Sequence, residues 1–500
     1  MLILETLSSV AAYAGYIALS TTLLIIGYRI FLHPLHRYPG PFFAKLTAWY
    51  AGIFVLQQRL PQKIWRIHEK YGPVVRIAPD RLVFNTITAL QDIYQSGQIT
   101  KAYTYSSTNL NGVPNVFSAL DIDVHRSKRK VIGQAITDRA MRTFEPIMTE
   151  QINIYLKQIL EASQSSTPVN MTEKSRYLGL DIVGQLAFGY DLAVQKREDN
   201  RYIMGAMYFG SLRGNIFHHL FFLSKLYVSK FFDWAFYEVR EKYWRLMENM
   251  IKSRMAEDKH AKPDLYSFVA DAMSADPDSL RGGTLWSEAS FFLIAGGDTV
   301  STGISATFFY LSRNPECYRT LANEIRSTFA SGSDIKAGPQ LSSCTYLRAC
   351  IDESLRMSPP ISTTLWREQD PKSSAPLVVD GHVIPRGTLI GVNAYALHHN
   401  EEKLALDAFS AFSIGARACA GKPMAYLESS LVLARTLWYF DFEPAPGGLG
   451  AVGGGRMGAR DGRVRPGEFQ VHDAFTARHD GPYLVFRPRG DLVGEISASA

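Results

Sequence analysis

One cysteine of the chain stands in a pattern that suits a metal-bound thiolate. The pattern reads Phe-x-x-Gly-x-Arg-x-Cys-x-Gly, with Phe412, Gly415, Arg417, Cys419 and Gly421 at the specified positions. A cysteine binds a metal as the thiolate, and the positive end of the helix expected to follow favours that anion. The glycines permit a tight loop around the sulfur, the arginine can pair with an anionic group, and the aromatic ring can pack beside the ligand. A lone cysteine is usually only a small buried hydrophobe, but a chance match to this pattern has a probability on the order of 10⁻⁴.

A second candidate is an acid and an alcohol in an apolar helix. Asp298 and Thr299 follow Ala295, Gly296 and Gly297 inside the apolar pattern from Ser287 to Ser312. A glycine in the middle of a helix costs about 1 kcal/mol relative to alanine, so two of them indicate a requirement for small residues. Polar groups buried in such a helix need a partner or a function.

A third candidate is an ion pair on one helical face. Glu353 and Arg356 stand at positions i and i+3, where their side chains can meet. Such pairs usually lie in solvent and contribute little to stability. The apolar neighbours Leu347, Ile351 and Leu355 favour a helix that is buried instead.

Helical patterns dominate the elements that must position these residues. Apolar residues recur at spacings of three and four over Arg139 to Leu160, Thr172 to Phe188, Phe231 to Asp258, Ser287 to Ser312, Pro315 to Phe329 and Pro423 to Tyr439. Strand patterns are short, and we expect them at Val74 to Asn85 as a hairpin, Leu377 to Ile384 with a turn at Asp380-Gly381, Asn393 to Asn400, and Pro482 to Phe486. The prediction is a mostly α fold with small peripheral β-sheets.

The cysteine pattern resembles the haem-binding loop of the cytochrome P450 superfamily, and the two upstream motifs stand in that family's order. The overall likeness is to fungal microsomal enzymes of secondary metabolism. It implies the cytochrome P450 fold, haem b with Cys419 as the axial thiolate, and proton relay by Asp298 and Thr299. It also implies that His125, Arg129 and Arg367 contact the haem together with the loop residues. By the same likeness, the substrate pocket is lined by Val113, Val116, Phe117, Ala295, Gly296, Ile361, Thr364, Leu365 and Phe475.

The chain departs from that family just before the cysteine loop. Relatives carry a longer stretch with a Pro-x-Arg element, whose arginine completes a triad with the Glu353 and Arg356 pair. Here only the segment from Glu401 to Ala411 intervenes, with no proline or arginine. We therefore expect the glutamate and arginine to remain a pair, and either a deletion or a weakened haem site.

The N-terminus predicts a membrane anchor. The stretch from Thr6 to Tyr28 contains no charged residue and is long enough to cross a hydrocarbon core of roughly 30 Å. A cleaved signal peptide would need a basic start and a shorter apolar core. Arg29, Arg37 and Lys45 follow, so the positive-inside rule places the remainder in the cytosol. We expect residues 1–31 to anchor a single-pass protein in the endoplasmic reticulum membrane, residues 32–45 to form a proline-rich hinge, and residues 46–500 to form the haem-thiolate domain.

Composition and the remaining motifs limit the partners. The formal charge of +6 is mild for 500 residues and predicts no nucleic-acid partner, and four cysteines without a C-x-x-C pair disfavour a disulfide scaffold or structural zinc site. Gly448, Gly450 and Gly453 match the spacing of a dinucleotide fingerprint, but prolines precede them and more glycines follow, which favours a surface loop. Electrons must then come from another protein. The resemblance implies NADPH-cytochrome P450 reductase, with cytochrome b5 as a further candidate, and we expect docking near Lys128 and Lys130.

The leading hypothesis is a monooxygenase that inserts one oxygen atom from O₂ into a lipophilic small molecule with electrons from NADPH. A second hypothesis keeps the haem and changes the reaction to a rearrangement or dehydration without external electrons. A third is a haem-free, inactive membrane protein that results from the shortened segment.

Overall fold

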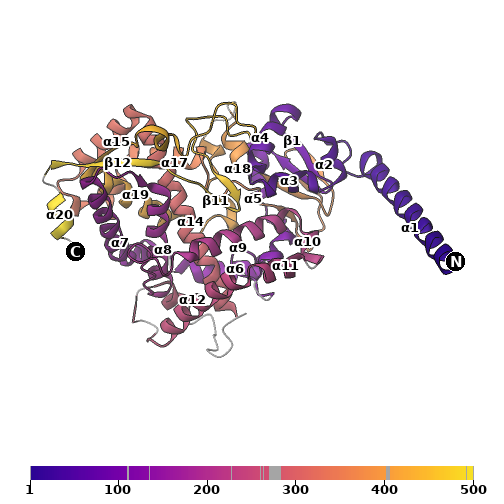
Figure 1. Ribbon diagram of the computed structural model, residues 1–500, viewed down its shortest axis with the longest axis horizontal. Coiled ribbons are helices and arrows are strands. Elements are labelled where there is room, and N and C mark those ends of the chain that lie inside the picture. The colour runs from indigo at the N-terminus through magenta and orange to yellow at the C-terminus, as the bar shows by residue number, and fades with distance from the viewer. Residues whose placement is uncertain are drawn as a thin grey trace.

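Two long helices pack closely in the middle of the body. The computed structural model describes residues 2–498 except 110–111, 135, 227, 259–260, 263, 270–282, 401–405 and 491–492. Helix α14 (Thr284–Arg313) lies against α8 (Met171–Phe188) (Figure 1). A Cβ on Gly296 would lie 2.6 Å from Val183, and one on Gly297 would lie 2.8 Å from Leu180. The glycines therefore permit the close approach of the two helices, which gives a packing reason for their presence in mid-helix.

The other helices belong to the body around this pair, except α1, which projects from it (Figure 1). They are α1 (Leu2–Gly27), α2 (Phe42–Leu46), α3 (Trp49–Leu56), α4 (Leu60–Tyr71), α5 (Ile87–Tyr94), α6 (Ile122–Gln134), α7 (Asp138–Gln164), α9 (Tyr202–His219), α10 (Phe222–Lys225), α11 (Val228–Ala235), α12 (Tyr237–Met255), α13 (Leu265–Val269), α15 (Pro315–Thr328), α16 (Pro339–Ser342), α17 (Thr345–Met357), α18 (Ala394–His398), α19 (Lys422–Tyr439) and α20 (Val493–Ala498). Shorter turns include η1 (Tyr28–Leu32), η2 (Tyr103–Thr108), η3 (Gly332–Asp334), η5 (Leu406–Ala408), η6 (Gly415–Arg417) and η7 (Gly447–Ala451).

Small sheets lie at the edges of the helical body. A five-stranded sheet has the order β1-β2-β8-β5-β3, in which β2 and β8 are parallel and the other neighbours are antiparallel. A three-stranded sheet has the order β4-β12-β9, and β6-β7 and β10-β11 are hairpins. The strands are β1 (Val74–Ala78), β2 (Arg81–Phe84), β3 (Ile99–Lys101), β4 (Val169–Asn170), β5 (Arg367–Gln369), β6 (Leu377–Val379), β7 (His382–Ile384), β8 (Leu389–Val392), β9 (Phe440–Pro444), β10 (His472–Ala474), β11 (Thr476–Arg478) and β12 (Tyr483–Pro488).

The mostly α prediction is confirmed, and two element predictions are wrong. The segment from Asn393 to Asn400 is helix α18 rather than a strand, because the side chain of Asn393 caps it by accepting a hydrogen bond from the backbone N–H of Ala396 at 3.0 Å. The single helix expected from Phe231 to Asp258 is divided into α11 and α12. Phe236 lies between them with φ −114° and ψ 24°, which are not helical angles.

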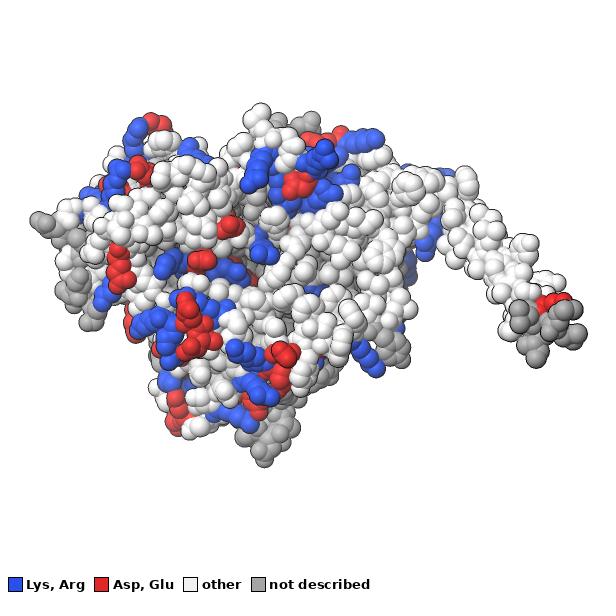
Figure 2. Space-filling view, in the orientation of Figure 1, with Lys and Arg blue, Asp and Glu red and all other residues white. Residues whose placement is uncertain are grey.

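Helix α1 extends away from the body (Figure 1). The segment Glu5–Leu32 is long and apolar enough to cross a membrane, and none of its most apolar stretch is buried in the protein. The space-filling view shows almost no charged side chains on this helix, whereas basic and acidic side chains are mixed over the body (Figure 2). Arg29, at the end of the segment, is joined to the body by a hydrogen bond to the carbonyl of Leu46.

Candidate active site

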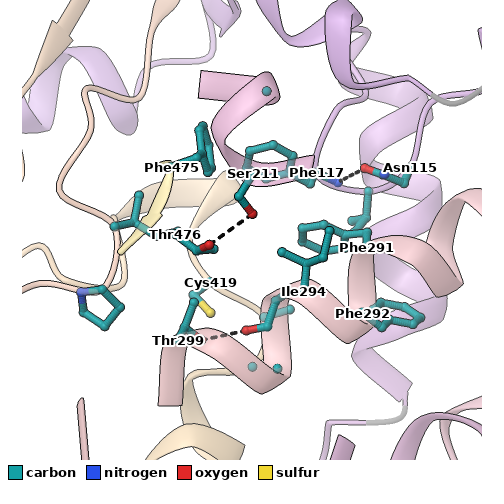
Figure 3. A pocket seen from close by; sticks show the side chains of 18 of the residues that line it. Asn115, Phe117, Ser211, Phe291, Phe292, Ile294, Thr299, Cys419, Phe475 and Thr476 are labelled. Carbon is teal, nitrogen blue, oxygen red and sulfur yellow. Dashed lines mark hydrogen bonds between the residues drawn. The ribbon is translucent and has the colours of Figure 1, made fainter. Parts of the chain in front are cut away.

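A cavity of about 820 Å³ lies between α14 and the start of α19. Rings and aliphatic side chains from several elements form much of its wall, among them Phe117, Phe291, Ile294 and Phe475, and the sulfur of Cys419 faces it (Figure 3). Phe117 stacks on Phe291 with ring centroids 5.3 Å apart and meets Phe475 edge-on at 5.4 Å. A pocket of this size and character suits a small hydrophobic molecule.

The loop that carries Cys419 is held by its own glycine. Gly415 has φ +75°, and a Cβ at this position would lie 2.0 Å from the carbonyl oxygen of Tyr94, so only glycine fits. The turn then brings the backbone N–H of Cys419 to 2.9 Å from the carbonyl of Phe412. The ring of Phe412 packs on Tyr426 with centroids 5.0 Å apart, and both rings line the cavity. Gly415 itself lies behind the loop, against Tyr94.

Opposing influences act on the thiol of Cys419. Burial is the largest influence and raises the pKa of the thiol overall, although the backbone N–H groups of Gly421 and Lys422 and the charges of Arg129 and Lys422 oppose the rise. The residue is nevertheless accessible from the cavity. Amides at the start of α19 aimed at a sulfur are what a thiolate ligand requires, and a soft cation bound to that sulfur would hold it deprotonated.

Basic side chains gather along the same cavity. Arg129 donates to the carbonyl of Ala418 at 2.8 Å, Arg417 donates to the carbonyl of Leu120 at 2.8 Å, and Arg367 donates to the hydroxyl of Tyr105 at 3.2 Å. Among the described residues, the hydrogen bonds that these guanidinium groups donate go to carbonyl and hydroxyl oxygens rather than to carboxylates. Burial, followed by repulsion from Arg367, lowers the pKa of Arg417 to about 10.

Crowded positive charge also lowers the pKa values of residues next to these arginines. Burial and the charges of Arg417 and Lys101 lower the pKa of His125 to about 3, and burial and neighbouring arginines lower the pKa of Lys101 well below its ordinary value. All of these residues line the cavity. The cluster fits a ligand that carries negative charges, and together with the cysteine it fits haem, which has two carboxylates and an iron.

Asp298 and Thr299 lie on different sides of α14. Thr299 lines the cavity near Cys419 and donates its hydroxyl proton to the carbonyl of Ala295 at 2.6 Å (Figure 3). Asp298 instead faces a second pocket of about 330 Å³, where its carboxylate pairs with Arg176 at 3.0 Å. The two residues are adjacent in sequence, but in the structure they do not line one cavity.

Most of the predicted substrate pocket is brought together. Seven of the nine residues line the cavity: Val116, Phe117, Ala295, Gly296, Ile361, Leu365 and Phe475. Val113 and Thr364 are not among the described residues that line it. Val113 presents its carbonyl to the hydroxyl of Ser287, and the hydroxyl of Thr364 accepts from Asn393 while Thr363 faces the cavity. The sequence therefore predicts the correct segment of the cavity wall, but at this position the side chain that faces the cavity is the neighbouring residue.

The pair of Glu353 and Arg356 forms on α17. Arg356 donates to both carboxylate oxygens of Glu353 at 2.7 Å. It also donates to the carbonyl of His398, so a backbone group contacts the arginine as well. One face of α17 is buried through Leu347, Ile351 and Leu355, while the Glu353 side chain is 60% exposed. The first five residues of the shortened segment, 401–405, lie outside the described residues.

Docking of a redox partner near Lys128 and Lys130 stays a prediction, but Lys128 itself is not a free basic residue of the surface. Its ammonium lies 2.9 Å from Glu288, and its side chain is only 14% exposed. Lys130 is exposed. The sequence pattern of a basic helix does not reveal this inward pairing, because the acid is 160 positions away in the chain.

Other residues of the site carry no sequence signal. Arg176 pairs with Asp298, and Ser211 and Thr476 bring hydroxyls to the cavity from α9 and β11. Glu428, on α19, is buried beside the cavity. Serine, threonine and isolated acids are common in any sequence, so only their meeting in space marks these residues.

Comparison with known proteins agrees with this geometry. The chain matches the family model described as Cytochrome P450 over residues 39–404 and 401–449. It is 34% identical to cytochrome P450 monooxygenase apf7 of Gibberella fujikuroi over 541 aligned positions, which cover 98% of this chain and 100% of that protein. It is 32% identical to AKT7 of Alternaria alternata, covering 93% and 94%, and 32% identical to poxM of Penicillium oxalicum, covering 93% and 92%; both are named cytochrome P450 monooxygenases.

The family match is divided at one place. Its two segments overlap at residues 401–404, inside the stretch that we expect from the sequence to be shortened. The alignment with apf7 extends over 541 positions, more than the 500 residues of this chain, so it contains gaps.

Proposed function

The chain belongs to the cytochrome P450 family and is a monooxygenase of the fungal, secondary-metabolism type, and on that premise we propose that it inserts one atom of O₂ into a lipophilic small molecule. Each turnover consumes O₂, two electrons and two protons, and yields an oxygenated product and one water. The electrons come from NADPH through a separate membrane-bound reductase, with cytochrome b5 as a further candidate donor. The largely apolar wall around Phe117, Phe291 and Phe475 supports the lipophilic substrate.

The residues present fit the cofactor of this family. Haem with a thiolate ligand supplies, when bound, the electron-transfer and oxygen-activating chemistry. Cys419 would hold the iron, and Arg129, Arg367 and Arg417, with His125, would hold the porphyrin carboxylates. The buried positive charge around Arg417, whose pKa is lowered to about 10 by burial and by Arg367, supports this assignment, because two carboxylates would neutralise it.

The residues of α14 would manage protons from two sides. Thr299 keeps its hydroxyl at the cavity wall by donating to Ala295, so that its oxygen can accept a hydrogen bond from water or a reacting group. Asp298 is held by Arg176 at the second pocket, from which protons would reach the helix. This arrangement supports oxygen reduction rather than a rearrangement without external electrons.

One observation carries the proposal: the sulfur of Cys419 faces a large cavity at the start of α19, and Arg129, Arg367 and Arg417 line the same cavity. The test is the carbon monoxide difference spectrum of membranes that contain the full chain. Cys419→Ala should abolish the band of the reduced thiolate complex, whereas Cys317→Ala, which changes an exposed cysteine, should retain it. An unchanged spectrum in Cys419→Ala would refute the ligand assignment.

The shortened segment supports a second candidate, a haem-free membrane protein. The family match is divided at residues 401–404, just before the cysteine loop. A purified full chain without a Soret band, even after addition of hemin, would select this candidate. If insertion of the corresponding segment from a relative such as apf7 then gave haem binding, the missing residues would be the cause.

The protein is proposed to be anchored in the endoplasmic reticulum membrane with its body in the cytosol. Besides α1, exposed apolar side chains lie on α2, α3 and α11, including Phe43 at 65% and Trp234 at 75% exposure. Trp49 on α3 contacts Phe222 on α10, with ring centroids 5.8 Å apart, so the apolar surfaces of α3 and α10 adjoin. Deletion of residues 1–31 should weaken but not abolish membrane association in a carbonate wash. Complete release into the soluble fraction would contradict the contribution of the body.

A further inference from the structure

Two arginines and one aspartate meet at the wall of the cavity that Cys419 faces. Arg213 lies on α9, Asp233 on α11 and Arg240 on α12, and all three residues line the cavity. Resting on the proposed monooxygenase function, we propose that the two arginines bind an anionic group of the substrate, so that the substrate is a lipophilic carboxylic acid.

The charges of this group do not cancel. Oδ1 of Asp233 lies 2.6 Å from Nη1 of Arg240 and 3.9 Å from Nη2 of Arg213. The distance to Arg213 is too long for a hydrogen bond, so the aspartate mainly neutralises Arg240. Among the described residues that line the cavity, the other acid is Glu428, which lies on α19. One positive charge therefore remains, and it matches a carboxylate better than a phosphate monoester, which carries a charge of about −1.5 to −2 at neutral pH.

Both guanidinium groups also have a donor without an acceptor. Nε of Arg213 is buried and has no hydrogen-bond partner among the described residues, and the same holds for Nε of Arg240. Burial lowers the pKa of Arg213, Asp233 opposes that effect, and the charge of Arg240 adds to it. A buried donor without an acceptor costs free energy, and a carboxylate of the substrate would supply both the acceptor and the missing negative charge.

Aromatic rings hold the two guanidinium groups in place. The guanidinium carbon of Arg213 lies 5.0 Å from the centre of the Phe217 ring, and that of Arg240 lies 4.8 Å from the centre of the Trp244 ring. The side chains of Arg213 and Arg240 are 33% and 29% exposed, so a ligand can reach them. The charged group is thus positioned before a substrate arrives, which lowers the entropic cost of recognition.

The place of the charged group leaves the rest of the substrate inside the cavity. Figure 3 shows α9, through Ser211, on the side of the cavity opposite Thr299 of α14. Phe232 and Phe236 line the cavity beside the charged group, so an apolar ring or chain attached to the anion finds apolar contacts at once. The substrate would therefore extend from α9 toward Cys419, and oxidation should fall on a carbon remote from the acid group.

An ion-pair tie between α9, α11 and α12 is the alternative role of the group. Such a tie would be weakened by removal of either sign of charge. Binding of an anion, in contrast, should be weakened by removal of an arginine and strengthened by removal of the aspartate. The two roles therefore predict opposite results for one variant, Asp233→Asn.

The experiment measures the binding of two matched probes to the full chain in phosphatidylcholine nanodiscs. The probes are 4-(1-pyrenyl)butanoic acid and 4-(1-pyrenyl)butan-1-ol, which differ only in the terminal group. Equilibrium dialysis against empty nanodiscs measures binding at about pH 8, where a carboxyl group is ionised. A hydrogen bond to a charged group is stronger than a neutral one, so the acid should bind about tenfold more tightly than the alcohol. Equal binding, or tighter binding of the alcohol, would overturn the proposal.

Two variants of opposite charge change locate the site. Arg213→Gln should weaken binding of the acid about tenfold and leave binding of the alcohol unchanged, which shows that the cavity is intact. Asp233→Asn should strengthen binding of the acid about fivefold, because it removes a repelling charge, and such a gain cannot result from misfolding. Equal loss of both probes in Arg213→Gln, or no gain in Asp233→Asn, would identify the structural tie instead and overturn the assignment.

Arg245→Gln is the matched control. It removes the same charge from α12, at a side chain that is 72% exposed and lies 3.1 Å from Glu241. Arg245 is not among the described residues that line the cavity, so the affinities of both probes should stay the same. A loss of acid binding equal to that in Arg213→Gln would show that the net charge of the protein, rather than this site, attracts the acid.

The Soret absorbance of the same samples reports on the proposed function separately. In a colourless protein, a preference for the acid that is lost in Arg213→Gln would remove the oxygenase function and keep the recognition site. A preference that survives in Arg213→Gln would come from the arginines near Cys419 and would overturn the assignment. Normal absorbance without any preference for the acid would keep the oxygenase function and reject the recognition site.

Discussion

The ammonium of Lys128 on α6 lies 2.9 Å from a carboxylate oxygen of Glu288 on α14, whose side chain is fully buried. The other oxygen of Glu288 accepts the backbone N–H of Val116 at 3.1 Å. Burial raises the pKa of Glu288, and the charge of Lys128 opposes that rise. This pair therefore joins α6, the loop that carries Phe117, and α14 into one wall of the cavity.

Removal of the acid should destabilise that wall. Glu288→Ala leaves the Lys128 ammonium and the Val116 N–H without their acceptor, and we expect a loss of about 3 kcal/mol in the free energy of unfolding. Asp123→Ala is the matched control, because its pair with Arg126 lies on the same helix α6 but in solvent, with side chains 71% and 74% exposed; its effect should be below about 1 kcal/mol. Denaturant unfolding measures the loss of unfolding free energy in each variant. Equal losses in Glu288→Ala and Asp123→Ala would show that burial of the ion pair does not matter for stability.

Loss of the hydroxyl at the cavity wall should uncouple oxygen use from product. In Thr299→Ala, O₂ and NADPH should still be consumed, while at least about tenfold less product forms per NADPH, because a positioned proton-transfer group typically contributes a factor of 10² or more. The ratio of product to NADPH and the release of hydrogen peroxide are the measurements. Thr307→Val is the control, since that hydroxyl also bonds within α14, to Gly303, and Thr307 is not among the described residues that line the cavity. Normal coupling in Thr299→Ala would remove this residue from the mechanism.

The basic cluster should matter for cofactor retention. Arg417→Gln removes one half-buried charge of the cavity wall. We expect at least about tenfold weaker hemin binding, since a hydrogen bond to a charged group contributes about 1.5–3 kcal/mol. Titration with hemin, followed at the Soret maximum, measures the affinity. Arg126→Gln, on the exposed face of α6, should bind hemin normally. If both variants bind hemin equally well, Arg417 does not contact the cofactor.

A buried acid on α19 should make stability depend on pH. Burial raises the pKa of Glu428 from 4.5 to about 8, and within the described residues its Oε1 has no hydrogen-bond partner. The folded chain therefore binds a proton that the unfolded chain releases, so the contribution of this residue to stability falls as pH rises from about 4.5 to about 8. Glu428→Gln removes this dependence.

The measurement is the difference in unfolding free energy between Glu428→Gln and the unaltered chain. This difference should favour the variant by about 2 kcal/mol or more at pH 9 compared with pH 5, within an upper limit of about 5 kcal/mol for a shift from 4.5 to about 8. Glu316→Gln, at a side chain that is 85% exposed, should give the same small difference at both pH values. A difference for Glu428→Gln that does not change with pH would contradict the shift.

Local sequence patterns predicted the secondary structure well where the residue types by themselves favour one backbone conformation. The hairpin with its turn at Asp380-Gly381 was predictable because both residues adopt positive φ there. The strand expected at Asn393 to Asn400 failed because a side-chain cap, which depends on the geometry at Asn393, outweighs the apolar content of the segment. The predicted lining of the pocket was wrong at Thr364, because Thr363 faces the cavity instead. Neighbouring side chains point in different directions along an extended segment, and the sequence does not reveal which of them faces inward.

The sequence by itself determined the chemistry that is written in consecutive residues: the cysteine loop from Phe412 to Gly421, its tight turn at Gly415, and the helical framework around it. These depend on local spacing, and local spacing is visible in a chain. Only the tertiary structure decided which distant side chains meet. It turned Asp298 away from Thr299 to Arg176, buried Lys128 against Glu288, and brought Ser211 and Thr476 to one place. Contacts between side chains far apart in the chain depend on helix packing angles and burial, which no short sequence pattern encodes.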